Sequence, residues 1–154
     1  MANEGSTGRN WRVYRNSGSW SSPTWTAVTE RKDISISFTK DEIECLRDGS
    51  EFKEYLKGYK DLALEFGISY TRNNANHVAF RTDFLLDTDS HFDLLVLDGP
   101  VSTSGVQGIR LVCALFQFDH AAALTDETEV TLSFKPTYAE DSGSAIVSDW
   151  YTVS

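Results

Sequence analysis

Three histidines and two cysteines are the side chains best suited to binding a metal ion. They are His77, His91, His120, Cys45 and Cys113. Zinc sites use ligands in short pairs, with about two to five residues between the members of a pair. None of these residues has a partner at such a spacing, so the sequence predicts no metal site. The histidines are interpreted as surface or interface residues, and the cysteines as free thiols in a reducing compartment.

A run of acidic residues superficially resembles the start of a calcium-binding loop. Asp87 and Asp89 have the spacing of the first ligands, and Asp98 lies at the twelfth position. Phe92, however, occupies the position where the sharp turn needs glycine, and the last ligand of such a loop is a glutamate. The segment is therefore predicted to be a connection between a helix and a strand, without calcium.

Catalytic and cofactor-binding motifs are also missing from the sequence. It contains no G-x-S-x-G nucleophile motif. Gly99, Gly105 and Gly108 have neither the Walker nor the dinucleotide-binding spacing. Glu42 and Glu44 could in principle act as paired carboxylates, but on a strand they are expected to be solvated. The sequence predicts no catalytic residue, no cofactor and no enzyme activity.

The overall composition is that of a globular protein with an acidic surface. The chain has 154 residues, 40% of them hydrophobic, and a formal net charge of −9. This charge disfavours gripping nucleic-acid phosphates, which requires lysine and arginine. It permits a surface that nucleic acid passes without adsorbing, and the alternative is that the acidity only maintains solubility. No apolar run reaches the roughly 20 residues of a membrane span, and residues 1–10 lack the features of a signal peptide.

Alternation of apolar and polar residues predicts a chain dominated by β-strands. The clearest pattern is at residues 62–70, where Leu62, Leu64 and Phe66 alternate with smaller or polar side chains. Residues 92–97 and 109–118 are apolar on both faces and are expected to be buried or central. Further strands are expected at residues 9–14, 25–28, 33–38, 42–47, 130–134 and 145–153.

Two segments have helical features. Residues 75–86 follow a possible N-cap and are apolar on most sides, which predicts a helix that is covered on more than one side. Residues 48–60 begin with Asp48 and Glu51 in a capping-box arrangement. Phe52, Tyr55 and Tyr59 then follow at helical spacing. Glycines bracket this second segment, which is expected to be a helical turn within a loop.

These elements predict a mainly β fold: a β-sandwich or partly open barrel with one flanking α-helix. Residues 1–154 are expected to form one domain, with residues 1–10 as a flexible N-terminal arm. A sheet of this kind has edges, which proteins either protect or pair. Few prolines are present to protect them, so pairing between subunits is expected.

Four tryptophans support an alternative function. Trp20 and Trp25 flank a turn and could form a stacking platform for sugars, as in a carbohydrate-binding β-sandwich module. The opposing interpretation is that they pack in the core or in an interface, because aromatic residues dominate burial. A small enzyme of another kind is the third possibility.

The order of features resembles that of the tail tube (major tail) proteins of long-tailed bacteriophages. The resemblance begins with Trp11-Arg12-Val13-Tyr14 and the alternating residues 33–38. It continues through residues 41–62, in which Gly58 and Asp61 form a Gly-x-x-Asp stretch, and through the helix and strand at 75–86 and 92–97. It ends with a central strand, the turn at 124–126, and residues 130–136.

This resemblance implies a structural virion protein that forms hexameric rings, stacked into a hollow tube through which DNA is delivered. The tube of bacterial type VI secretion has a related architecture. The implied partners are further copies of the chain and the tape-measure, tail-terminator and baseplate proteins. DNA would cross the lumen without specific binding, no membrane would be involved, and the virion tail would assemble in the host cytoplasm.

Two groups of residues are expected to serve this assembly. Residues 40–61 are expected to form an inter-subunit loop that reaches a neighbouring subunit or ring, through Asp48, Phe52, Lys53, Tyr55, Leu56, Lys57 and Tyr59. A second group is expected to line the lumen, because its members are expected on strand faces opposite the apolar ones: Ser35, Ser37, Glu42, Glu44 and Glu65.

Overall fold

The computed structural model of the chain describes residues 10–154 apart from 50, 87–89, 123, 125–126 and 142. Most of the expected N-terminal arm, the beginning of the calcium-like segment and part of the turn at 124–126 therefore lie outside the described residues. The described elements are β1 (Arg12–Asn16), β2 (Trp25–Ala27), β3 (Arg31–Cys45), β4 (Glu54–Ser69), α1 (Ala75–Leu85), β5 (Phe92–Leu97), β6 (Gln107–Ala121), β7 (Glu129–Pro136), β8 (Ala139–Asp141), β9 (Ser144–Ile146) and β10 (Asp149–Thr152).

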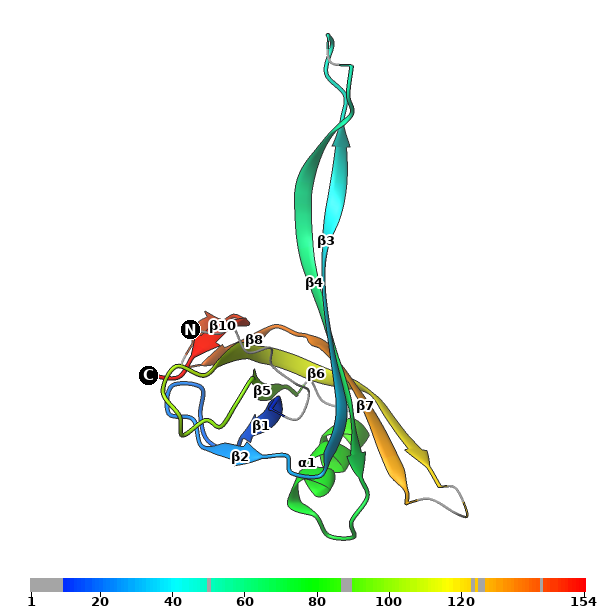
Figure 1. Cartoon of the computed structure of the whole chain (residues 1–154), viewed down its shortest axis with the longest axis vertical. Helices are drawn as coiled ribbons and strands as arrows, with labels where there is room; N and C mark the ends of the chain where they lie inside the picture. The colour runs from blue at the N-terminus through cyan, green and yellow to red at the C-terminus, as the bar shows by residue number, and fades with distance from the viewer. Residues whose placement is uncertain (1–9, 50, 87–89, 123, 125–126, 142) are drawn as a thin grey trace, which may run out of the picture.

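One antiparallel sheet organises the molecule (Figure 1). Its strand order is β2-β1-β5-β6-β7-β4-β3, and β10 pairs with β6 beside this path. Strands β8 and β9 form a separate two-stranded sheet. Among the described elements β2 and β3 are the two ends of the large sheet, which therefore remains open. The mainly β fold with one flanking helix, predicted from the sequence, is confirmed.

The main core lies on one face of the large sheet and is covered by α1. Alternating residues of β4 point into it: Leu64, Phe66 and Ile68 are almost completely buried. The helix contributes Phe80, which has no exposed surface and whose ring lies 5.2–6.2 Å from those of Phe66, Phe92 and Phe134. Edge-to-face contacts of this kind add to the burial of the rings.

A smaller cluster covers the opposite face of β5. Leu95 and Leu97 pack there with Tyr14, against partly buried side chains from the 98–106 connection and β10. Strand β5 is thus covered on both faces, as its continuous apolar run predicted, and β6 lies centrally between β5 on one side and β7 with β10 on the other. Both predictions are confirmed.

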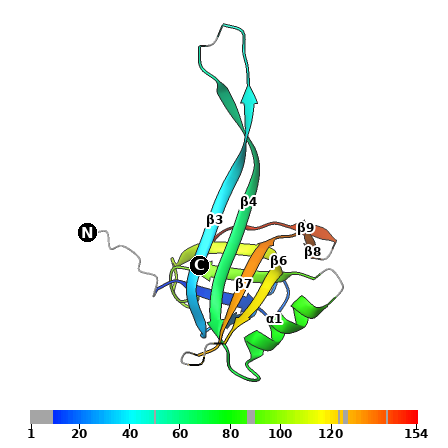
Figure 2. The same ribbon diagram turned by 90° about the vertical axis from the view of Figure 1, so that its right-hand side faces the viewer.

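Helix α1 begins as the sequence predicted. The side-chain Oδ1 of Asn74 accepts hydrogen bonds from the backbone N–H groups of Asn76 and His77, at 3.0 and 3.2 Å. This satisfies donors that have no partner within the helix. The helix lies beside the β6–β7 end of the sheet (Figure 2), and its last residue, Leu85, is one residue before the predicted end.

A buried ion pair links the first residues of β5 to the first residues of β6. Arg110 donates to both carboxylate oxygens of Asp93, and its shortest contact is 2.6 Å, from Nη2 to Oδ2. The guanidinium also lies over the Trp20 ring, 3.7 Å from its centroid, and 5.0 Å from that of Trp25. Nη2 donates to the Trp20 carbonyl as well. The turn that contains Trp20 is thereby tied to the centre of the sheet.

The prediction for residues 48–60 is wrong. Strand β4 starts at Glu54 and runs to Ser69, so residues 54–60 are a β-strand rather than a helical turn, and Asp48 and Gly49 lie in the turn of a hairpin. The strand expected at 42–47 is the continuation of β3 rather than a separate element. The expected loop at residues 40–61 is consequently the outer half of one long β3–β4 hairpin. The strand expected at 145–153 is divided between β9 and β10.

Candidate assembly interface

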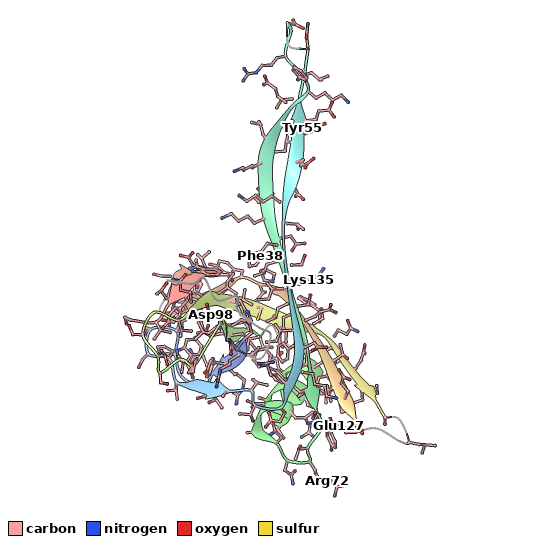
Figure 3. All side chains as sticks on the ribbon, viewed as in Figure 1. Phe38, Tyr55, Arg72, Asp98, Glu127 and Lys135 are labelled. Carbon is pink, nitrogen blue, oxygen red and sulfur yellow. The ribbon has the colours of Figure 1, made fainter. Side chains whose placement is uncertain are left out.

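The β3–β4 hairpin projects well beyond the body of the molecule (Figure 1). Its strands pair from Arg31 opposite Ile68 to Cys45 opposite Glu54. The inner half belongs to the core, because Leu62 and the alternating residues after it in β4 are buried. Residues 40–61 lie beyond this core and are here called the arm. Figure 3 places Phe38 at the base of the arm and Tyr55 where the paired strands end, below the turn of the hairpin.

The arm exposes a set of large apolar side chains. Tyr59 is 88% exposed, Phe52 81% and Leu46 80%. Ile43, Tyr55 and Leu56 are more than half exposed. A two-stranded hairpin without further packing is at best marginally stable in water, and exposed apolar surface on this scale is typical of protein–protein contact sites. The inter-subunit residues expected from the sequence all lie on this arm.

A bulge in β4 marks the base of the arm. Lys40 pairs with Lys60, whereas Glu42 pairs with Lys57, so β4 contains one residue more than β3 between these pairs. Gly58 lies in the bulge, and a Cβ atom there would come within 2.8 Å of the Cβ of Asp41. The Gly-x-x-Asp stretch noted in the sequence therefore lies within β4, where the glycine permits the close approach of β3.

The register gives the arm two different faces. Residues that pair across the strands share a face. One face carries three pairs that are mostly charged: Lys40 with Lys60, Glu42 with Lys57, and Glu44 with Tyr55. The other face carries Thr39 with Asp61, Ile43 with Leu56, and Cys45 with Glu54. Exposed large side chains are thus present on both faces, Tyr55 among the charged residues of the first face and Ile43 with Leu56 on the second.

Two ion pairs hold the end of the arm. Arg47 Nε lies 3.1 Å from Glu54 Oε2, and Lys53 Nζ lies 3.5 Å from Glu44 Oε1. These side chains are well exposed, and exposed ion pairs contribute only about 0.2–1 kcal/mol. They orient the turn rather than stabilise the fold. Asp48 lies within the same turn and is exposed.

The residues expected to line a lumen do not share one face. Ser35 pairs with Glu65 and Ser37 with Ala63, on the face of the hairpin opposite the core. Glu42 and Glu44 continue instead the row of Ile34, Ile36 and Phe38, because β3 has no extra residue after Ile34. Glu42 and Glu44 lie opposite Ile43 and Leu56, but on the other face of β3 from Ser35 and Ser37, so the five residues do not form one wall within a single chain. All five side chains are exposed.

An apolar groove lies at the base of the arm, where the sheet stays open between β3 and the β6–β10 pair. It has a volume of about 630 Å³. Its wall is formed by side chains of β3, β6 and β10 and by Trp11, most of them apolar: Ile34, Ile36, Phe38, Ile109 and Trp150. This groove is here called the seam groove. It is a second apolar surface, and none of its lining residues belongs to the arm.

Trp20 and Trp25 do not form the sugar-stacking platform of the alternative interpretation. Trp20 and Trp25 both lie against the guanidinium of Arg110, and Trp11 packs against the main core. Trp150 is 56% exposed, and its indole N–H donates to Gln107 at 3.1 Å. The interpretation of Trp20 and Trp25 as packing residues accounts for their positions.

Among the histidines and cysteines, two histidines lie together, which the sequence did not predict. His77 is buried, against the expectation of a surface residue, and its Nε2 lies 3.4 Å from Nε2 of His120. Among the described residues no group of three or more histidine, cysteine, aspartate or glutamate side chains is arranged to hold a metal ion. Both cysteines are free. Burial is the main cause that raises the pKa of Cys113, followed by the charges of Asp93 and Asp83, which makes it an unreactive thiol.

Within the described ranges no helix is long and apolar enough to cross a membrane. No family model matches the sequence, and no curated protein matches it either.

The fold is that of tail tube subunits. The chain superposes on the tail of a gene transfer agent particle, refined with C6 symmetry, with a TM-score of 0.66 at 14% identity, over 86% of this chain and 95% of the other. It superposes on a chain of the anti-feeding prophage baseplate with a TM-score of 0.68 at 10% identity, over 99% of both chains. For the SPP1 tail tube the TM-score is 0.66 at 9% identity, over 95% of this chain and 78% of the other.

Proposed function

We propose that this chain is a structural subunit whose copies form hexameric rings that stack into a hollow tail tube, through which DNA is delivered. The observation that carries the proposal is the arm: a hairpin that leaves the body and exposes apolar residues on both of its faces. The tail tube fold supports it, as does the sixfold symmetry named for the gene transfer agent tail and the anti-feeding prophage baseplate.

The proposed contact between copies is head-to-tail. Such contacts use two different surfaces of each subunit, and they close into a ring or extend into a filament according to the rotation between copies. The arm and the seam groove are two distinct apolar surfaces that suit this geometry. We assign the contact between neighbouring subunits or rings to Asp48, Phe52, Lys53, Tyr55, Leu56, Lys57 and Tyr59.

The proposed subunit has no catalytic role and needs no cofactor. Its further partners would be the proteins that begin, measure and end a tail, namely baseplate, tape-measure and tail-terminator proteins, with assembly in the host cytoplasm and a final position in the virion tail. The similar solved chains include members of a baseplate and of a sheath/tube terminator structure. A carbohydrate-binding module is the second candidate from the sequence, but the packing of Trp20 and Trp25 does not favour it.

Negative-stain electron microscopy of the purified chain tests the proposal. We expect long hollow fibres or stacked rings at concentrations at which an unrelated control protein remains dispersed. A strictly monomeric species at every concentration would contradict the proposal, and monomers that also bind a glycan array would favour the carbohydrate-binding alternative.

The lumen assignment gives a second prediction. We propose that the Ser35, Ser37 and Glu65 face lines the lumen, where an acidic wall would repel DNA within a screening length of about 8–10 Å. Glu42 and Glu44 were assigned to the same wall, but they lie on the opposite face of β3. The two faces can therefore be tested separately.

Gold labelling of assembled fibres distinguishes the faces. In a Cys45→Ser background, Ser37→Cys and Glu42→Cys each introduce one accessible thiol for a maleimide–gold label. We expect gold on the fibre axis for Ser37→Cys and away from the axis for Glu42→Cys. Gold on the outer wall for Ser37→Cys would overturn the lumen assignment, and the axial position for both variants would require a wall built from both faces.

A further inference from the structure

Two histidines from distant parts of the chain meet where α1 packs on β6. His77 lies near the start of the helix and is 3% exposed, whereas His120 lies near the end of β6 and is exposed. Their Nε2 atoms are 3.4 Å apart, across 43 residues of sequence. This is the distance of a hydrogen bond in which one ring donates and the other accepts.

Aromatic rings from three elements surround the pair. Tyr70, directly after β4, has its ring centroid 4.8 Å from His77 and 5.7 Å from His120. Phe118 of β6 lies 5.5 Å from His77 and 5.1 Å from His120. Phe84, the next-to-last residue of α1, stacks on Phe118 with a ring-centroid distance of 5.8 Å. The pair is therefore the polar centre of the contact between the helix and the β6–β7 hairpin.

The hydrogen bond depends on the number of protons that the two rings share. In the neutral pair one ring donates its Nε2–H and the other accepts at Nε2. One additional proton leaves a charged donor and a neutral acceptor, which is a stronger, charge-assisted hydrogen bond. A second additional proton leaves two donors, no acceptor and two positive charges. Only the doubly protonated pair is repulsive.

The neighbouring charges do not neutralise such a pair. On α1, Arg81 follows His77 by one helical turn and adds positive charge. On β6, Asp119 precedes His120, but successive residues of a strand point to opposite faces of the sheet, and its carboxylate accepts a hydrogen bond from Gln117. On β7, His120 pairs with Val130, and the adjacent Glu129 is ion-paired with Lys32 at 3.7 Å. From the end of β4, Tyr70 presents an uncharged ring.

We propose that His77 and His120 form an acid-sensitive latch, which holds α1 against the β6–β7 hairpin and opens when both rings are protonated. Phe80, in the middle of α1, packs in the main core independently of the histidine pair, and the other members of that core come from the strands and the segments beside them. Opening of the latch therefore loosens the contact of α1 with the β6–β7 hairpin, while Phe80 keeps the helix on the core. None of the residues of the latch belongs to the arm or to the seam groove.

The direction of the pH dependence follows from the burial of His77. Burial, and then the charges of His120 and Arg81, lower the pKa of His77 below its ordinary value. A histidine whose pKa is lowered by folding stabilises the folded state fully above its unfolded pKa of about 6.5 and loses that contribution as the pH falls below it. The latch is thus closed at neutral pH and opens in the acidic range below about 6.5.

Hydrogen exchange of the full chain tests the latch. We expect the protection factors of the α1 amides, corrected for intrinsic exchange, to fall about tenfold between pH 7.5 and 5.0, because the opened state binds more protons than the closed latch in this range. The amides of β5 should keep their protection. Carboxylates do not dominate this interval, because their ordinary pKa values are about 3.9 to 4.3.

Three variants separate the latch from a general effect of acid. His120→Gln replaces the second ring by an amide that can still donate or accept but cannot gain a charge, and we expect it to remove the pH response of α1. His77→Gln should remove it as well, whereas His91→Gln, at an exposed histidine outside the cluster, should keep it. A wild-type pH response in His120→Gln, or unchanged α1 protection in the wild-type chain, would overturn the proposal.

Discussion

Replacing Phe52 and Tyr55 together by serine is expected to abolish fibre formation and leave a folded monomer. Both rings are exposed on the arm, Phe52 by 81% and Tyr55 by 55%, so the monomer loses little when they are removed. In the proposed assembly both are buried at every contact between copies. Burial of one such ring contributes about 1.5–3 kcal/mol, and this loss is repeated at each contact along the tube.

Sedimentation velocity and electron microscopy report the assembly, and circular dichroism reports the fold. A matched control is the double variant Phe116→Ser and Tyr138→Ser, which removes two exposed aromatic rings from the body instead of the arm. We expect the control to form fibres and the arm variant to remain monomeric with an unchanged β-rich spectrum. Wild-type-like fibres from the arm variant would contradict the assigned interface.

The second large effect is expected at the buried ion pair. Asp93→Ala should lower the free energy of unfolding by about 3–5 kcal/mol, because it leaves the buried guanidinium of Arg110 without its counter-charge. The side chains of Arg110 and Asp93 are only 13% and 8% exposed. The carboxylate also accepts a hydrogen bond from Asn16 Nδ2 at 2.8 Å, and this is lost as well.

Urea denaturation of the monomeric arm variant measures this effect without interference from assembly. Glu54→Ala removes an ion pair of the exposed arm and should cost no more than about 1 kcal/mol. The double replacement Asp93→Leu with Arg110→Met should recover much of the loss, because the uncompensated charge causes most of it. A cost for Asp93→Ala similar to that for Glu54→Ala would show that the pair is not a buried constraint.

The sequence predicts correctly those elements in which each face stays either buried or exposed along the whole element. Residues 62–70 alternate because one face of β4 lies on the core, and residues 92–97 are continuously apolar because β5 is covered on both faces. Asn74 is a residue type favoured at the N-cap, and it predicts the start of α1, where its side chain accepts hydrogen bonds from two backbone N–H groups. Each of these signals is local, so the sequence alone is sufficient.

The helical turn predicted at residues 48–60 is wrong because exposed apolar side chains lie on both faces of the arm. Phe52, Tyr55 and Tyr59 are spaced like the apolar side of a helix, and Asp48 with Glu51 resembles its cap. In the structure Tyr55 and the adjacent Leu56 point to opposite faces of a hairpin, and the bulge at Gly58 interrupts the alternation. Apolar residues on both faces remove the period of two on which strand prediction depends.

Contacts between distant segments account for other differences. The pairing of Arg110 with Asp93 and of His77 with His120 depends on strand register and on how the helix docks, neither of which is encoded in residue spacing. The division of the expected lumen residues between two faces has a different, local origin. Ser35 and Glu42 differ by an odd number of positions on β3, and an uninterrupted reading of the alternation from Ile34 would have separated them.

The most direct measurement of the central claim is a helical reconstruction of fibres formed by the wild-type chain. We predict that the arm of each copy packs on a neighbouring copy, with Phe52, Tyr55 and Tyr59 buried in that contact. We also predict that Ser37 and Glu65 face an open channel along the fibre axis. An arm that extends into solvent, or fibres held together only by other surfaces, would contradict the proposal that this hairpin builds the tube.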